Sequence, residues 1–533
     1  MMFVVFLFLL SVFWYNALMS VYENDVYQSS PTPTTPSRRS RRERESRTNP
    51  TNSRQTNSQK ESFLSFDHLN LLIFSLVLSL TFYSFPLWSH QAVYMQSQNL
   101  YSGLAMNQGQ VPYNNFWGTG GVLFYVINWA GTLGNSTLFL YLFELIALVM
   151  SGIFVRRLIV ETTGNKLAAR LTSLGAVIVI AGLSRGGDTP ALFALPFVLW
   201  AVIFLNRYFT DQINKDEAFI LYGLSAGIVF VISPIMILLW IVSFIPLIIH
   251  NIKNKKTAVG FYQFLGTILG ILIIGYSVGY FSLNQQTSYI SLEQSLFIPF
   301  TRFGISGEFF TNLVKTIVVL LVFNFATQFM IGMRLKKESQ VRAWHISLLT
   351  GSVFSVFIIL FSYGFDVTNF LVLLPLLIIF VGVGLRSAIV NKRNLLSHYL
   401  GQHLFMPMIA LLVTVALPLY GHFIKNHQVI QDEQTIAQYV KNNTNSGDNV
   451  YVIGPDKNIN LLSGRVTDID NIPAHYPTKY KTGYDLNVSQ IKDKYIIVDK
   501  SMAIPESTKT LLKSTYTNVK DLTTASFDIY KIK

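Results

Sequence analysis

Few side chains outside the apolar runs of this 533-residue sequence could perform acid–base or phosphate chemistry. Asp188, in the segment LSRGGDTP, is a candidate general base because it lies in a polar turn beside Arg185. The alternative is an aspartate that caps a helix starting at Pro190. Asp366, in SYGFDVTN, allows the same capping interpretation.

Arg302 is the best candidate for binding a phosphate. It stands alone among aromatic residues in IPFTRFGISGEFF, and its planar guanidinium matches phosphate oxygens. Arg185 is a second candidate, and for both the alternative is an anchor at the membrane interface. His90 has no second histidine or carboxylate nearby, and no metal-ligand spacing occurs elsewhere. We therefore predict no metal site, while a divalent cation at a departing phosphate stays an open alternative.

A series of amide and aromatic side chains lies between the second apolar run and residue 117. Aromatic rings cover sugar faces and amides satisfy sugar hydroxyls, so the series predicts a sugar-binding groove. A helix lying at the bilayer surface explains the same pattern, and both interpretations can hold together. The series comprises Tyr94, Gln96, Gln98, Asn99, Tyr101, Tyr113, Asn114, Asn115, Phe116 and Trp117.

The composition is that of a membrane protein. Hydrophobic residues make up 51% and charged residues 13% of the chain, whereas soluble proteins carry about 25% charged residues. The formal charge is +13, but the basic residues lie in short clusters between apolar runs, where they orient a membrane protein. Nucleic acid is therefore not a predicted partner. The sequence contains no cysteine, which excludes disulfides and thiol chemistry.

Apolar runs of roughly 17 to 25 residues can cross a bilayer as helices. About twelve such runs, some of them shorter, predict a mainly α, multi-pass bundle of about 11–12 transmembrane helices. They lie near residues 2–19, 69–88, 134–154, 171–185, 190–206, 218–233, 236–250, 260–281, 315–333, 346–363, 368–385 and 404–421.

Basic clusters occupy alternate loops, which the positive-inside rule places in the cytoplasm of a cell-membrane protein. The alternation places a first outer loop at about 89–133, the turn near 186–189 and everything after about 422 on the extracytoplasmic side. Residues 1–20 are predicted to be a retained hydrophobic helix. Residues 21–68 are polar and basic and lack the apolar residues to fold, so we expect a disordered cytoplasmic linker.

Residues 69–421 then form the transmembrane domain, and residues 422–533 read as a small α/β domain. The stretch EQTIAQYVKNNT has helical periodicity. The runs DNVYVIG, KYIIVDK and SFDIYKIK are typical of strands, bounded by turn-forming residues.

Several stretches in order along the chain resemble the bacterial GT-C-fold polytopic glycosyltransferases, the protein-mannosyltransferase-like or family-39-like group. They are QNLYSGLAMNQGQVPYNNFWGTGGVLFYVINWAG, GGDTPALFALPFVLW, NFLVLLPLL and the tail IAQYVKNNTNSGDNVYVIG. The resemblance covers about residue 69 to the end. It implies transfer of a sugar from a polyprenyl-phosphate donor on the outer side of the membrane of a bacterial cell envelope.

The resemblance also exposes a missing acid. In that family the first outer loop carries a catalytic Asp or Glu ahead of a G-x-x-P-Y pattern, which this chain keeps from Gly109 to Tyr113. The corresponding place reads Met95-Gln96, and no Asp or Glu occurs from His68 to Phe143. Activity is therefore either altered or lost.

Three functions follow as hypotheses. The first is a glycosyltransferase that uses a polyprenyl-phosphate-linked sugar and a displaced acid such as Asp188, and that acts on a cell-envelope glycan or protein. The second is a non-catalytic relative that binds lipid-linked glycan or a partner glycosyltransferase. The third is a transporter or flippase, which is disfavoured because the apolar runs show neither a buried pair of charged residues nor matched broken helices in two halves.

Overall fold

The computed structural model describes residues 66–533, apart from 88, 93–94, 211–215, 298–308, 335–340, 363–364, 421–426, 468–491, 503, 505, 520–521 and 523. The chain divides into two compact units, Met1–Leu69 and Asn70–Lys533. The hydrophobic helix predicted at 2–19 and nearly all of the predicted linker lie outside the described residues.

Long apolar helices dominate the membrane domain. Eight helices in the described part of the chain are long and apolar enough to cross a membrane, or nine if the bent pair α13–α14 is one span. With the shorter apolar helices α2 (Phe66–Ser79) and α8, they fall on eleven of the runs predicted from the sequence. The set is α5 (Leu138–Thr163), α6 (Lys166–Ser184), α7 (Pro190–Phe209), α8 (Ala218–Ile232), α9 (Leu238–Lys253), α10 (Thr257–Asn284), α13 (Phe309–Val322), α14 (Phe325–Met333), α15 (Arg342–Phe361), α16 (Leu373–Val390) and α18 (Phe405–Tyr420).

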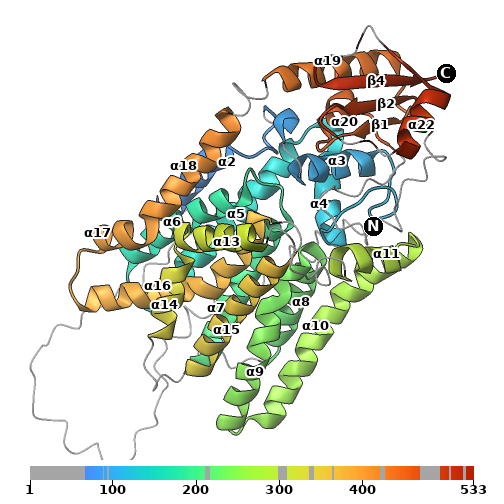
Figure 1. Ribbon diagram of the computed structural model, residues 1–533. Helices are drawn as coiled ribbons and strands as arrows, with labels where there is room; N and C mark the ends of the chain where they lie inside the picture. Colours follow the sequence, from blue (N-terminus) through green and yellow to red (C-terminus); the bar gives the residue numbers. More distant parts are fainter. Residues whose placement is uncertain are drawn as a thin grey trace, which may run out of the picture. The chain divides into compact units, whose positions relative to one another are not determined.

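The degree of burial separates core helices from peripheral ones. α7 is apolar on all sides and 89% of its apolar window is buried, as expected for a helix at the centre of a bundle. α10 is only 17% buried and packs chiefly on α8; Figure 1 shows it along one side of the bundle. A Cβ atom on Gly223 of α8 would lie 2.0 Å from the Thr267 carbonyl oxygen, so glycine permits this close approach.

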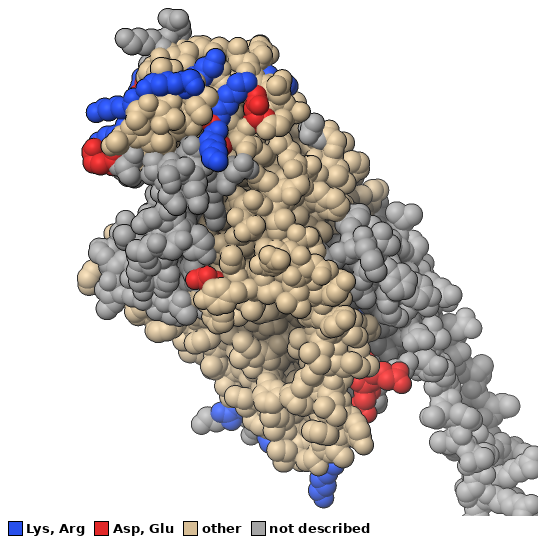
Figure 2. Space-filling model, turned by 90° about the vertical axis from the view of Figure 1, so that its right-hand side faces the viewer, with Lys and Arg blue, Asp and Glu red and all other residues tan. Residues whose placement is uncertain are grey.

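The distribution of charge agrees with a membrane-embedded band. On the face drawn in Figure 2, lysine and arginine side chains gather at the two ends, and the broad band between them is almost free of them. Apolar side chains such as Ile245, Phe261 and Leu272 are exposed on α9 and α10. The molecule is thus a multi-pass membrane protein, as its composition predicts.

Three of the predicted spans differ in detail from the observed helices. The run at 69–88 is helical only to Ser79, because the following residues leave the helix to hydrogen-bond the turn between α6 and α7. The run at 315–333 is broken between α13 and α14, which meet at a bend of 74°. The run at 404–421 begins earlier, with α17 (Leu395–Tyr399) and a π-helical segment at Leu400–Leu404.

The C-terminal part forms the predicted α/β unit. Its elements are α19 (His427–Asn443), β1 (Val450–Ile453), α20 (Asn458–Ser463), β2 (Tyr495–Asp499), α22 (Glu506–Thr515), β3 (Tyr516–Asn518) and β4 (Phe527–Ile532). The sheet order is β1-β2-β4-β3, with β1 and β2 parallel and the other pairs antiparallel. Alternate residues face two cores, with Ile497 on one side and Ile496 on the other.

Candidate functional site

The loop of residues 89–133, which the sequence predicts to be the first outer loop, lies beneath the C-terminal domain (Figure 1). The loop carries η1 (Ser89–Gln91), α3 (Met95–Asn107) and α4 (Val122–Gly131), and Figure 1 shows α3 next to α20 and the sheet. The Lys457 backbone N–H donates to Ser97 Oγ at 3.1 Å, and the Thr467 N–H donates to the Tyr101 hydroxyl at 3.0 Å. Tyr101 is only 1% exposed. The polar side chains of α3 are therefore largely used inside the molecule.

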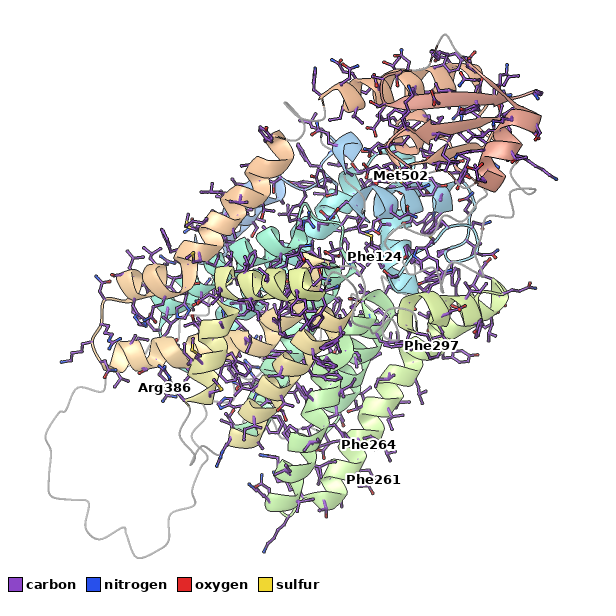
Figure 3. All side chains as sticks on the ribbon, viewed as in Figure 1. Phe124, Phe261, Phe264, Phe297, Arg386 and Met502 are labelled. Atoms are coloured by element: carbon purple, nitrogen blue, oxygen red, sulfur yellow. The ribbon has the colours of Figure 1, made fainter. Side chains whose placement is uncertain are left out.

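Two glutamines extend this contact at the end of α3. Gln108 Nε2 donates to the Gly464 carbonyl at 2.9 Å, and Gln110 Nε2 donates to the Thr467 carbonyl at 2.7 Å. On its other side the loop is fixed to the bundle through α4. Phe124, labelled in Figure 3, is fully buried and lies 6.1 Å from the Phe193 ring of α7.

The turn between α6 and α7 has an unusual backbone. Arg185, Gly186, Gly187 and Asp188 have φ values of 48°, 99°, 82° and 43°, all in the left-handed region. A Cβ atom on Gly186 would lie 2.4 Å from the Tyr83 ring, and one on Gly187 would lie 2.6 Å from Glu144 Oε2. Glycine is therefore required at both positions, and the tight turn brings Asp188 onto α5.

Glu144 and Asp188 form the centre of a buried polar cluster. The Asp188 backbone N–H donates to Glu144 Oε1 at 2.5 Å, and Ser84 Oγ donates to Glu144 Oε2 at 2.5 Å. Asn128 Nδ2 donates to Asp188 Oδ1 at 3.1 Å, and Asn99 Nδ2 donates to the Asp188 carbonyl at 2.7 Å. The cluster thus joins the α6–α7 turn to α3, α4 and α5, and also to the segment after α2 that contains Ser84.

The buried position of the cluster makes two negative charges there unfavourable. Glu144 and Asp188 are both 0% exposed, and within the described residues no basic side chain forms an ion pair with either of them. Two uncompensated buried negative charges are very costly, so the pair holds at least one proton near neutral pH. Burial raises the pKa of Asp188 to about 7, although the hydrogen bond from Asn128 opposes this shift.

Asp188 does not cap α7, because the residue at the cap is Thr189, whose side chain makes no capping bond. Asp188 Oδ2 and the neighbouring Asn128 Oδ1 and Thr189 Oγ1 have no hydrogen-bond partner among the described residues. Asp188 therefore keeps one carboxylate oxygen that could accept a proton. Asp366, by contrast, is a helix cap, since its side chain accepts the Thr368 N–H at 3.0 Å.

Glu144 is the residue that the sequence reading missed. It lies inside the apolar run LFLYLFELIALVM of α5, directly after the acid-free stretch that ends at Phe143. A single carboxylate within a predicted span is itself a signal of function or pairing. The apolar runs were expected to contain no buried pair of charged residues; the structure shows Glu144 of one such run fully buried, where it accepts the backbone N–H of the equally buried turn residue Asp188.

Metal binding finds no support in the described part of the chain. No group of three or more His, Cys, Asp or Glu side chains lies close enough there to hold an ion. Arg302, the predicted phosphate ligand, lies outside the described residues.

Sequence comparisons assign the chain to a family. Residues 56–427 match the family described as "Putative competence-induced protein Ccs4 N-terminal domain", and residues 430–533 match the corresponding Ccs4 C-terminal domain. The chain belongs to the Ccs4 competence-induced protein family. A search of curated protein sequences finds no match.

The fold of this Ccs4-family chain is similar to that of ArnT from Cupriavidus metallidurans. The apo crystal structure aligns with a TM-score of 0.58 at 12% identity and covers 87% of this chain and 97% of ArnT. The crystal structure of ArnT bound to undecaprenyl phosphate aligns with a TM-score of 0.55 at 11% identity over the same shares. The Ccs4-family chain therefore has the GT-C fold predicted from its sequence.

The remaining predicted residues of the Ccs4-family chain lie in different surroundings. Gln96 and Arg185 come together, because Gln96 Nε2 donates to the Arg185 carbonyl at 3.3 Å while the arginine is exposed. Gln98 Nε2 donates to the Trp117 carbonyl at 3.3 Å, and the tryptophan is buried. The Tyr113 hydroxyl donates to the Gly120 carbonyl at 2.7 Å. The exposed residues of the series include Asn114, and Met95 is half-buried.

Proposed function

We propose that this Ccs4-family chain is a membrane glycosyltransferase that transfers a sugar from a polyprenyl-phosphate-linked donor to a cell-envelope glycan or protein. The GT-C fold shared with ArnT over 87% of the chain supports the donor class. The observation that carries the activity is the buried Asp188, whose Oδ2 has no partner among the described residues and whose pKa is raised to about 7. A general base works best with a pKa near the working pH.

The proposed reaction assigns a separate part to each group. Asp188 Oδ2 takes the proton of the acceptor hydroxyl while the hydroxyl oxygen of the acceptor forms a bond to the anomeric carbon of the donor sugar. The bond from that carbon to the phosphate oxygen breaks, and its electron pair stays on the polyprenyl phosphate. Arg302, or the exposed Arg185, would stabilise this negative charge.

Burial of the base sets a condition on this mechanism. Asp188 is 0% exposed, and its turn lies under α3 through the hydrogen bonds from Gln96 and Asn99. An acceptor hydroxyl can reach Asp188 only if α3 moves away from the turn. Transfer is therefore expected to require a change at the contact between α3 and the C-terminal domain.

A second candidate is a non-catalytic GT-C protein that binds lipid-linked glycan or a partner glycosyltransferase. The specific observation in its favour is the first outer loop, which has no Asp or Glu from His68 to Phe143. The same loop is largely covered by the C-terminal domain through Tyr101 and Ser97. In this alternative the buried carboxyl pair only fixes the loop.

We further propose that the C-terminal domain and the α6–α7 turn lie on the extracytoplasmic side of the cell membrane. The support is the alternation of basic loops, in which Arg156, Arg170, Lys253 and Arg393 mark one side. Donor and acceptor would then meet outside the cytoplasm.

The deciding experiment measures sugar transfer from a polyprenyl-phosphate donor pool to envelope acceptors in membranes that contain the full chain. The variant Asp188→Asn keeps the shape of the side chain and removes the base, and Asp366→Asn is the matched control at a capping aspartate. Loss of transfer in Asp188→Asn alone supports the enzyme. No transfer by the unmodified chain, with donor binding intact, supports the second candidate, and a gain in Gln96→Asp would locate the lost acid.

A further inference from the structure

Two irregular helical segments meet inside the membrane domain, away from the Glu144–Asp188 cluster. The first is the break between α13 and α14, where Asn324 has a φ of 64°. The second is the π-helical segment Leu400–Leu404 that precedes α18. Asn324 joins them, because its Nδ2 donates to the Gln402 carbonyl and also contacts His403 Nδ1 at 2.9 Å.

A small cavity borders this junction, and we call it the π-helix chamber. Its volume is about 20 Å³, which is room for roughly one water molecule. Helices α6, α14, α16, α17 and the π-helical segment supply its walls. The polar lining side chains are Thr172, Gln328, Tyr399 and His403, and the other lining residues are apolar or aromatic.

Two polar atoms of the chamber lack partners in the described structure. They are His403 Nε2 and Gln328 Oε1. Both side chains are more than nine-tenths buried, with exposures of 6% for His403 and 8% for Gln328. A buried polar atom without a hydrogen bond costs about 1–3 kcal/mol, so two such atoms on side chains that line one cavity favour a bound polar ligand.

The contact with Asn324 fixes the proton on the histidine. An amide nitrogen only donates, so His403 Nδ1 must accept from Asn324 Nδ2. The neutral ring then carries its hydrogen on Nε2, and a second hydrogen on Nδ1 would face the amide hydrogens. The chamber thus presents one donor, His403 Nε2–H, and one acceptor, Gln328 Oε1.

We propose that the π-helix chamber is a binding site for a single water molecule that accepts from His403 Nε2–H and donates to Gln328 Oε1. Irregular backbone at membrane depth persists only where it is enclosed by protein or lines a hydrated cavity, and both irregular segments adjoin this chamber. The water completes a chain from Asn324 through the imidazole to Gln328. It therefore links α14 to the start of α18, and it does so independently of any transferase activity.

The direct test is a high-resolution density map of the full chain in a lipid nanodisc. The expected result is a peak within hydrogen-bond distance of both His403 Nε2 and Gln328 Oε1. A chamber without a peak, or a direct bond between the two side chains, overturns the proposal. Nitrogen-15 spectra of the histidines should also show His403 as the neutral tautomer that carries its hydrogen on Nε2. A ring protonated on Nδ1 contradicts the assignment.

A coupling measurement tests the same link without a map. His403→Phe keeps an aromatic ring but removes the Nε2–H donor together with the Nδ1 acceptor of Asn324 Nδ2, and Gln328→Met removes the acceptor Oε1. Each single variant should lower the thermal stability of the detergent-solubilised chain, and the double variant should lose clearly less than the sum. Strict additivity contradicts the link. His403→Phe combined with Ser243→Ala, on α9 and outside the chamber lining, is the matched control and should be additive.

Discussion

The hydroxyl of Tyr101 offers a sharp test of how the C-terminal domain is held over the first outer loop. The variant Tyr101→Phe keeps the buried ring, including its face 5.7 Å from Lys457 Nζ, and removes the hydroxyl that accepts the Thr467 N–H. Loss of this buried hydrogen bond costs about 1–3 kcal/mol. At about 1.4 kcal/mol per factor of ten, the closed contact weakens by roughly 5- to 150-fold.

Hydrogen–deuterium exchange of the full chain measures this weakening. Peptides that contain Thr467 should exchange faster in Tyr101→Phe by a factor in that range, while peptides from α7 keep their protection. Tyr113→Phe is the matched control, because its hydroxyl donates to Gly120 within the loop and not to the C-terminal domain. Unchanged exchange at Thr467 in Tyr101→Phe would refute the conclusion that this hydrogen bond holds the C-terminal domain against the loop.

Three further outcomes are expected. If Asp188 is the base, sugar transfer should rise with pH through about 7 and level off above it, because the carboxylate form is the active one; a flat profile argues against that role. Glu144→Ala leaves the Ser84 hydroxyl and the Asp188 N–H without their acceptor and should destabilise the chain by about 2–6 kcal/mol in thermal denaturation, with Glu144→Gln less affected. Burial, with Asp456 nearby, raises the pKa of Glu433 to about 8; the folded chain then holds a proton that the unfolded chain releases, so stability should fall as pH rises from about 4.5 to 8, and Glu433→Gln should flatten that part of the pH–stability curve.

The helical architecture could be predicted because the bilayer imposes length and apolarity on each span. Runs such as 190–206 and 218–233 coincide with α7 and α8 almost to the residue. The ends of other spans could not be predicted, because tertiary hydrogen bonds decide them. Tyr83, four residues after the end of α2, donates its N–H to the Gly186 carbonyl at 2.7 Å. Nothing in the neighbouring sequence predicts that bond.

Of the two acidic residues of the candidate site, the sequence analysis identified only one. Asp188 stood out because a polar turn between two apolar runs is easily recognised. Its partner Glu144 lies 44 residues earlier in another helix, so periodicity cannot pair them. The amide and aromatic series of the first loop was interpreted as a sugar-binding groove or a surface helix, and neither interpretation included the C-terminal domain, to which Tyr101 of the series and the nearby Gln110 are hydrogen-bonded. Spacing along one loop carries no information about a domain more than three hundred residues downstream.

The strand order of the C-terminal sheet has a consequence for synthesis. β4 is the last of the four strands in sequence, yet it lies between β2 and β3 and pairs with both. The four-stranded sheet therefore cannot form until β4 has left the ribosome and has paired with β2 and β3. The bundle and its first loop are made hundreds of residues earlier, so α3 emerges uncovered. A newly made chain thus passes through an interval in which the loop is open to surrounding molecules, and that interval ends when β4 joins the sheet.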